Sequence, residues 1–258
     1  MRTKQEIVEN WLPRYTGRKL EDFDDYILIT NFAAYMELFA QKYKLKYEPQ
    51  GYPMSTLSAD GMTLINFGMG SPNAATMMDL LSAIQPKAVI FLGKCGGLKS
   101  INEVGDYLLP IAAIRGEGTG DDYLIHDIPS LPSFSVLKAI STAISDRHKD
   151  YWTGTVYTTN RRVWEHDDRF RAFLKSTHAT GIDMETATLF TVGFANKIPV
   201  GALLMISDMP MQPEGVKTEE SDKYVTQHFA FEHLCMGIEA LNILRSDSST
   251  IKHIKFSW

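Results

Sequence analysis

Cysteine is scarce in this chain, whose 258 residues include two, Cys95 and Cys235. Two widely separated cysteines support neither a disulfide framework nor a zinc site built from several thiolates. The seven histidines also lack the spacing of a ligand pair, so we expect no metal. So few cysteines are typical of a protein of the reducing cytoplasm.

Long apolar runs are missing as well. The first ten residues carry several charges and lack the apolar segment of a signal peptide, and no run is long enough to span a bilayer. Basic residues do not outnumber acidic ones: 26 Lys and Arg against 31 Asp and Glu leave a net charge of −5. That balance argues against general nucleic-acid binding. We therefore expect a cytoplasmic protein with neither a membrane nor a nucleic acid as its partner.

The composition, with 44% hydrophobic and 22% charged residues, is that of an ordinary globular protein. The length fits one α/β domain over residues 1–258, with two small domains as the alternative. Apolar, β-prone runs alternate with helical patterns, and Asp60-Gly61 marks one hairpin. That alternation predicts a three-layer α/β sandwich with a central mixed β-sheet. The expected strands are 26–30, 54–59, 62–67, 88–92, 107–114, 151–159 and 201–206, and the expected helices are 4–12, 31–43, 73–84, 134–144, 167–176, 185–195 and 219–245.

Several element ends can be predicted from local chemistry. Pro13 is expected to stop the first helix, and Asn31 to cap the second. Ser71 suits the cap of the third helix and Pro72 its first turn. The apolar strand 88–92 is expected to break at the glycine-rich stretch that begins with Gly93.

Two junctions between a strand and the segment that follows it carry carboxylates. Glu185 follows Met184 where a short apolar strand gives way to a helix, and Asp208 follows Ser207 at the end of another apolar strand. In α/β folds such junctions are where side chains meet a ligand. If the two strands are neighbours, both carboxylates face one pocket. The alternative for Glu185 is a favourable position near a helix N-terminus, and for Asp208 a turn cap.

Two glycine-rich stretches offer backbone N–H groups to an anion. The stretch 68–73 opens a helix, and the stretch 93–97, which includes Gly96, adds the cation of Lys94. A simple tight turn is the alternative in both places. A dinucleotide fingerprint would need a glycine at Ala74 and an acidic residue about 20 positions later near a second strand end. Neither is present, and we expect no cofactor.

Arginine and tryptophan gather after two other strands. Arg115 ends an apolar strand, while Arg161 and Arg162 precede Val163 and Trp164. A guanidinium group can grip a phosphate, and an indole can stack on a flat heterocycle. Surface ion pairs and a packed tryptophan are the competing interpretations.

The order of these motifs resembles the purine nucleoside phosphorylase and nucleosidase superfamily. Members of this superfamily show a Gly-x-Gly-x-Pro turn, a Gly-x-x-Gly-Gly turn, a Met-Glu pair at a helix start and a late Ser-Asp pair. This chain supplies them at residues 68–72, 93–97, 184–185 and 207–208. The long and unusual stretch 151–167 is similar to the AMP nucleosidase branch, and the resemblance extends over about residues 26–245.

The resemblance implies that AMP and water give adenine and ribose 5-phosphate. It assigns Asp208 as the acid at the purine and Glu185 as the acceptor of the ribose hydroxyls, with Met184 beneath the sugar. Trp164 or Val163 would line the base pocket, and Ser207 and Gly96 belong to the matching motifs. Candidate donors to the 5′-phosphate are Lys94, Arg115, Arg161 and Arg162. The group that activates the water stays open, with Glu117 as a guess.

Departures from the family pattern favour hydrolysis over phosphorolysis. The arginine that phosphorylases typically carry after the first strand is missing near Thr30, Phe91 occupies a second arginine position, and Lys94 replaces a serine or threonine. A purine nucleoside phosphorylase and a non-catalytic nucleotide-binding protein are the alternatives. The resemblance further implies a homo-oligomer, with a hexamer built as a trimer of dimers as the leading expectation. It implies a short form without an N-terminal regulatory domain, and the tail 251–258 is a candidate interface element.

Overall fold

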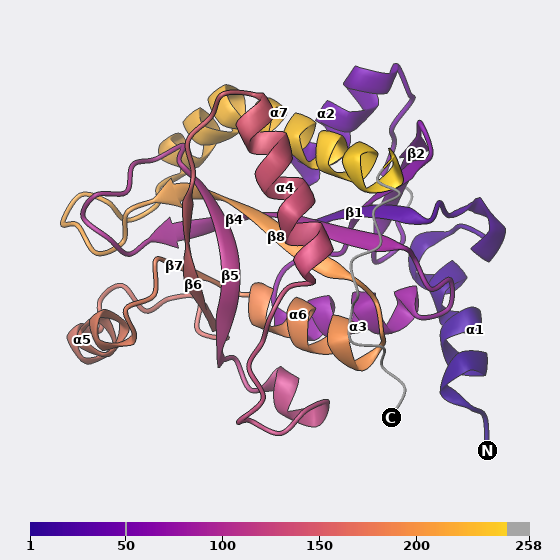
Figure 1. The fold of residues 1–258 in the computed structure, drawn as a ribbon, viewed down its shortest axis with the longest axis horizontal. Helices are drawn as coiled ribbons and strands as arrows, with labels where there is room; N and C mark the ends of the chain where they lie inside the picture. The colour runs from indigo at the N-terminus through magenta and orange to yellow at the C-terminus, as the bar shows by residue number, and fades with distance from the viewer. Residues whose placement is uncertain (50, 247–258) are drawn as a thin grey trace.

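The computed structural model of the chain describes residues 1–49 and 51–246. It places a mixed β-sheet between two layers of helices, as the alternation of elements predicts (Figure 1). The strands are β1 (Tyr26–Thr30), β2 (Ser55–Ala59), β3 (Met62–Asn66), β4 (Ala88–Gly97), β5 (Tyr107–Gly116), β6 (Trp152–Thr159), β7 (Gly181–Asp183) and β8 (Val200–Asp208). The helices are α1 (Lys4–Thr16), α2 (Ala33–Tyr43), α3 (Ser71–Leu81), α4 (Phe134–Asp146), α5 (Asp168–Thr177), α6 (Thr186–Ala195) and α7 (Glu219–Ser246), with short 3₁₀ turns η1 (Leu20–Asp22) and η2 (Thr119–Asp122). The predicted tail element 251–258 lies outside the described residues.

The eight strands run in the order β2-β3-β1-β4-β7-β6-β5-β8, and β4 also pairs with β8. That additional pairing closes β4, β7, β6, β5 and β8 into a ring, while β1, β3 and β2 extend it as an open sheet. β4 is parallel to β1 and β8 and antiparallel to β7. β4 therefore joins both halves, and the segments that carry the sequence motifs converge around its last residues.

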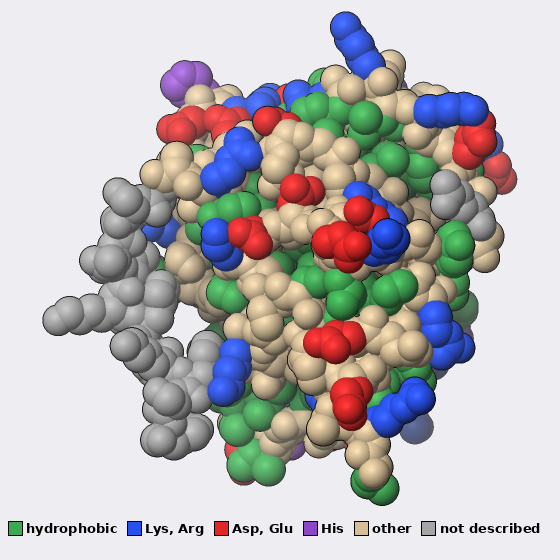
Figure 2. All heavy atoms as spheres, turned by 90° about the vertical axis from the view of Figure 1, so that its right-hand side faces the viewer, with side chains coloured by type: hydrophobic (Ala, Val, Ile, Leu, Met, Phe, Trp, Pro, Cys, Tyr) green, Lys and Arg blue, Asp and Glu red, His purple; other side chains and the backbone are tan. Residues whose placement is uncertain are grey.

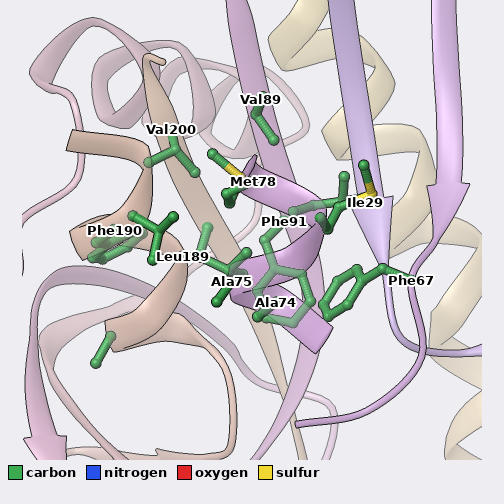
Figure 3. Close-up of a cluster of buried hydrophobic side chains, with 14 of the residues drawn as sticks. Ile29, Phe67, Ala74, Ala75, Met78, Val89, Phe91, Leu189, Phe190 and Val200 are labelled. Carbon is green, nitrogen blue, oxygen red and sulfur yellow. The ribbon is translucent and has the colours of Figure 1, made fainter. Parts of the chain in front are cut away.

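Two hydrophobic cores fix the helical layers. One core packs α3 and α6 against one face of the sheet, and Figure 3 shows Met78, Phe91 and Phe190 within it. The other core lies between the opposite face and α2, α4 and α7. In Figure 1, α7 accordingly lies above the strands, and α3 and α6 lie below them. Burial of these apolar side chains is the main stabilising contribution to the fold.

Three predicted element ends are wrong. α1 continues through Pro13 to Thr16 and ends at Gly17, whose left-handed φ of 70° suits a helix C-terminus. Asn31 does not cap α2, since Phe32 occupies the cap position without a side-chain hydrogen bond. Ser71 is already the first residue of α3, after Gly70, and its hydroxyl donates to the carbonyl of Met184 instead of capping the helix. Pro72 lies in the first turn of α3, as predicted.

The predicted break at Gly93 is also wrong, because residues 93–97 continue β4. Gly93 pairs with Leu204 and Lys94 with Met205 of β8, so this backbone belongs to the sheet. A Cβ atom on Gly93 would lie 2.5 Å from the ring of Phe91. The glycine there serves close packing inside the sheet and makes no turn.

The surface carries charges of both signs. On the face drawn in Figure 2, acidic and basic side chains are intermixed, in keeping with the small net charge of −5.

Among residues 1–49 and 51–246, no helix has the length and apolar character needed to cross a membrane. Cys95 and Cys235 are both buried and free.

Candidate active site

A pocket of about 230 Å³ opens among the ends of β1, β6, β7 and β8 and the last residues of β4. Both carboxylates singled out from the sequence, Glu185 and Asp208, line it. Several of the predicted binding residues line it with them: Lys94, Gly96, Arg161, Arg162, Trp164, Met184 and Ser207. The remaining lining comes from Asn31, Phe32, Met69, Cys95, Thr159, Glu165, Ile182, Asp183, Pro210, Lys217 and Asp222.

Glu185 occupies the cap position of α6 and is 2% exposed. Its Oε1 atom accepts a 2.7 Å hydrogen bond from the backbone N–H of Gly70, so the glycine turn before α3 holds this side chain. Burial and, to a smaller degree, the charge of the neighbouring Asp183 raise the pKa of Glu185 to about 7, against the lowering effect of hydrogen bonds from Gly70 and Asn31. Glu185 therefore changes its charge near neutral pH.

Asp183, the last residue of β7, organises the start of α6. Its Oδ2 accepts from the N–H and the hydroxyl of Thr186 at 2.7 and 2.5 Å and from the N–H of Glu185 at 3.2 Å. Its Oδ1 accepts from the Thr158 hydroxyl at 2.6 Å. Burial raises the pKa of Asp183, and these hydrogen bonds oppose the increase. Asp183 has no role among the predictions made from the sequence, although a carboxylate three positions before a threonine at a helix start is a recognisable capping signal.

Asp208 ends β8 in a more polar setting. The Ser207 hydroxyl donates to its Oδ1 at 2.7 Å, and Lys217 Nζ lies 3.5 Å from the same atom. Lys217 also lies 3.6 Å from Asp222, in the first turn of α7. Sequence reasoning missed Lys217, which belongs to the loop after β8 and has no motif of its own.

Lys94 lines the pocket but is engaged on several sides. Its Nζ donates to Asp222 at 3.0 Å and to the Thr226 hydroxyl at 2.8 Å, and it lies 4.5 Å from the centre of the Phe32 ring. Its side chain is 2% exposed, and burial lowers its pKa. Lys94 thus ties β4 to the start of α7, and few of its hydrogen-bonding directions remain for a ligand.

Arg161 and Arg162 lie at the exposed margin of the pocket. Arg161 pairs with Asp167 at 2.6 Å and Arg162 with Glu165 at 3.5 Å, and both side chains stay about half exposed, at 45% and 54%. Trp164 is buried, and its ring packs edge-on against Phe170 with 5.5 Å between the ring centres. One part of that indole lines the pocket and another belongs to a small core, so its packing is confirmed and its stacking on a heterocycle stays a prediction.

Three other candidates lie outside the lining of this pocket. Val163 is 69% exposed. The guanidinium of Arg115 is buried, donating to Asp121 at 2.6 Å and to the Leu124 and Ile125 carbonyls at 2.8 Å, which fastens the segment after η2. Glu117 accepts from the Gly120 N–H at 3.0 Å. Arg115 and Glu117 therefore stabilise a loop in this chain and do not reach the pocket.

Asn31 is the pocket residue whose role the sequence analysis misjudged. It follows Thr30 directly at the end of β1, and its side chain faces Glu185 and not the helix that it was expected to cap. An amide, several acidic groups in different surroundings and a basic rim thus surround one cavity. Such a set can bind a polar ring compound and donate or accept protons at two separate points.

The chain is similar to several known proteins. A sequence model of the phosphorylase superfamily matches residues 25–232. The chain is similar to the AMP nucleosidase of Escherichia coli strain K12, at 28% identity over 93% of this chain and 59% of that protein. It thus spans 59% of the length of that curated relative.

Solved structures give two further comparisons. AMP nucleosidase from Bacteroides thetaiotaomicron VPI-5482 is 65% identical, with a TM-score of 0.85 over 95% of this chain and 99% of that chain. Uridine phosphorylase from Vibrio fischeri ES114 shares the fold, with 22% identity and a TM-score of 0.74 over 88% of this chain and 94% of that chain.

Proposed function

The chain belongs to the phosphorylase superfamily, and we propose that it hydrolyses the N-glycosidic bond of AMP to adenine and ribose 5-phosphate. The observation that carries this proposal is the convergence of Met184, Glu185, Ser207 and Asp208 on one pocket. These residues form the two motifs that the family resemblance links to the sugar and to the base. The high identity to a bacterial AMP nucleosidase supports AMP as the substrate.

In this proposal the two carboxylates have separate tasks. Breaking the glycosidic bond builds positive charge on the ribose, and the buried Glu185 faces that charge while it accepts the ribose hydroxyls. The purine is a poor leaving group as an anion, so Asp208 supplies a proton to N7 as the bond breaks. Ser207 holds Asp208 through its 2.7 Å hydrogen bond, and Met184 packs beneath the sugar.

The donors to the 5′-phosphate are Arg161, Arg162 and Lys217 in this proposal. All three line the pocket, and the two arginines keep large exposed fractions that a phosphate can cover. Lys94 contributes less than the sequence analysis expects, because Asp222 and Thr226 already take its hydrogen bonds. Arg115 is assigned no role in a pocket formed by this chain alone, because its guanidinium is bound to the segment after η2.

Water is preferred over inorganic phosphate as the nucleophile. The motif position where phosphorylases place a small hydroxyl residue holds the Lys94 side chain, which fills that part of the pocket and is tied to α7.

A homo-hexamer built as a trimer of dimers, each copy a single catalytic domain, remains our proposal for the assembly. Light scattering on the purified protein measures this directly.

The decisive experiment is chromatography of AMP incubated with the full chain. We expect equimolar adenine and ribose 5-phosphate without added inorganic phosphate. Adenosine and inosine, each with and without phosphate, serve as comparisons. Base release from nucleosides that depends on phosphate, with no action on AMP, would identify a phosphorylase instead. Tight AMP binding without release of adenine would identify a nucleotide-binding protein.

A further inference from the structure

Asn31 has an unusual hydrogen-bonding state for a residue beside the proposed catalytic groups. Its side-chain oxygen Oδ1 is buried and has no hydrogen-bond partner among residues 1–49 and 51–246. A hydrogen bond from the same side chain lowers the pKa of Glu185. A hydrogen bond that lowers the pKa of a carboxyl group favours its ionised form, which can only accept, so the donor is the Nδ2 amide group. Oδ1 is therefore the atom of Asn31 that is left without a partner.

A buried acceptor without a donor is costly, and most buried acceptors in native proteins are paired. The nearest hydroxyl along the chain does not serve it, because Thr30 Oγ1 donates to the carbonyl of Leu92 at 3.0 Å. Because Asn31 lines the pocket, a bound molecule can supply the missing donor. Asn31 Oδ1 is thus an acceptor beside the Glu185 carboxylate that can bind an O–H or N–H group of a substrate or a water molecule in the pocket.

We propose that Asn31 Oδ1 accepts a hydrogen bond from the attacking water and, with Glu185, places that water against the anomeric carbon of the ribose. This inference rests on the proposed function and names the water-positioning group that the sequence analysis left open. Asn31 is a positioning residue in this scheme, because a neutral amide does not take up a proton near pH 7.

One bond forms and one bond breaks in the proposed step. The oxygen of the water forms a bond to C1′, and the bond from C1′ to the purine N9 breaks. The electron pair of the broken bond passes to the purine, which takes a proton from Asp208 at N7. The proton lost by the water passes to the Glu185 carboxylate, to which the Asn31 amide is hydrogen-bonded. Glu185 is suited to this exchange, since its pKa of about 7 lies near the working pH.

The test uses Asn31→Ala and Asn31→Asp in the full chain, with Asn10→Ala as the matched control. Asn10 lies on α1, is exposed and does not line the cavity. Each variant is assayed for adenine release from AMP, and the products are analysed in water and in water–methanol mixtures. Methanol competes as nucleophile and gives methyl riboside 5-phosphate, so the product ratio reports how well the water is held.

We expect Asn31→Ala to lower kcat roughly 100-fold, the scale of a misplaced reacting group, with KM for AMP within about threefold of the wild type. Its product ratio should shift toward the methyl riboside. Asn31→Asp keeps an acceptor oxygen at the same place and should recover part of the activity at high pH. The pH at which its kcat rises should be higher than in the wild type, because two neighbouring carboxylates ionise less readily than one. The control should match the wild type in kcat, in KM for AMP and in product ratio.

Two results would overturn this inference while leaving the proposed function intact. One is an Asn31→Ala enzyme with wild-type kcat and product ratio. The other is a raised KM with unchanged kcat, which would assign Oδ1 to a ribose hydroxyl. If the wild-type chain releases no adenine from AMP, the proposed function fails first and this inference fails with it. Thermal melting curves of each variant identify any loss that comes from misfolding, and Asn31→Asp, which has nearly the same shape, then carries the test.

Discussion

The backbone N–H of Gly70 donates a 2.7 Å hydrogen bond to Glu185 Oε1, which joins two segments 115 positions apart in the sequence. A second contact accompanies it, since the Ser71 hydroxyl donates to the carbonyl of Met184 at 2.7 Å. The glycine turn before α3 and the start of α6 thus hold each other in place. The turn that resembles an anion-binding loop in the sequence serves here to fix a carboxylate.

Gly70→Ala should therefore impair the site more than the fold. Gly70 has a φ of 93° and an extended ψ of 158°, a conformation that costs a residue with a Cβ atom about 1–3 kcal/mol. Relief of that strain would move the N–H away from Glu185, so we expect a turnover at least tenfold lower, measured as adenine release from AMP. Gly118→Ala is the control, because Gly118 has a φ of 78° and open space around it but no contact with Glu185. Equal losses of activity in both variants would contradict the assigned role of Gly70.

Glu185→Gln tests the charge of the buried carboxyl. With a pKa of about 7, the wild-type side chain is ionised above neutral pH, so turnover should rise through about pH 7. In the glutamine variant this rise of turnover with pH should be absent. Its turnover at pH 8 should be about 100-fold lower than that of the wild type, as measured by initial rates across pH. An unchanged pH profile in Glu185→Gln would exclude Glu185 as the group that titrates.

The same residue should also make stability depend on pH. Folding raises the pKa of Glu185 from 4.5 to about 7, so the folded state holds the proton more tightly than the unfolded state. Its contribution is therefore fully present below pH 4.5 and is lost as the pH rises through about 7, a change on the order of 3 kcal/mol for a shift from 4.5 to about 7. Urea denaturation at pH 5 and pH 8 should show a smaller difference in the free energy of unfolding for Glu185→Gln than for the wild type.

Asp208→Asn should remove the proton donor at the purine. We expect a loss of roughly 100-fold or more in turnover of AMP, the usual scale for a general acid. The same variant should lose much less turnover with 4-nitrophenyl riboside 5-phosphate, because the leaving group of this substrate needs no proton. Asp146→Asn, an exposed position at the end of α4, is the control. Near-normal turnover of AMP by Asp208→Asn would remove Asp208 from this role.

The fold could be predicted largely from the sequence because several of its strands are apolar runs bounded by turn residues. β1, for example, was predicted at its observed limits of Tyr26 and Thr30. Element ends were less predictable where a distant segment decides them. Gly93 remains in a strand because it pairs with Leu204, more than a hundred positions later, and local glycine chemistry does not reveal that partner.

The same physical reason separates the site residues that were found from those that were missed. Glu185 and Asp208 lie at strand ends, where the topology of an α/β fold brings side chains together. The environment of Lys94 is set by Asp222, 128 positions away, so its burial and pairing are invisible in the sequence. Asn31 looks like a helix cap by residue type, and only its position beside Glu185 reveals a different role.

Substitution of the basic residues should separate phosphate binding from support of the fold. Arg161→Ala and Arg162→Ala remove guanidinium groups at the exposed rim of the pocket, whose ion pairs there are weak. If either binds the 5′-phosphate, the loss of a charge-assisted hydrogen bond worth roughly 1.5–3 kcal/mol should raise the KM for AMP by about tenfold or more. Binding of adenosine, which has no phosphate, should change little.

Lys94→Met should affect stability more than the KM for AMP, in contrast to the two arginine variants. It removes a buried ammonium group that bridges Asp222 and Thr226, so we expect a lower melting temperature and a small change in the KM for AMP. Thr226→Val removes one of the same contacts without touching the pocket lining and is the matched control for stability. The comparison rests on the ratio of AMP to adenosine affinity, which a general loss of stability does not alter. A Lys94→Met enzyme whose AMP affinity falls as far as that of the arginine variants, with adenosine affinity unchanged, would restore Lys94 to the phosphate site.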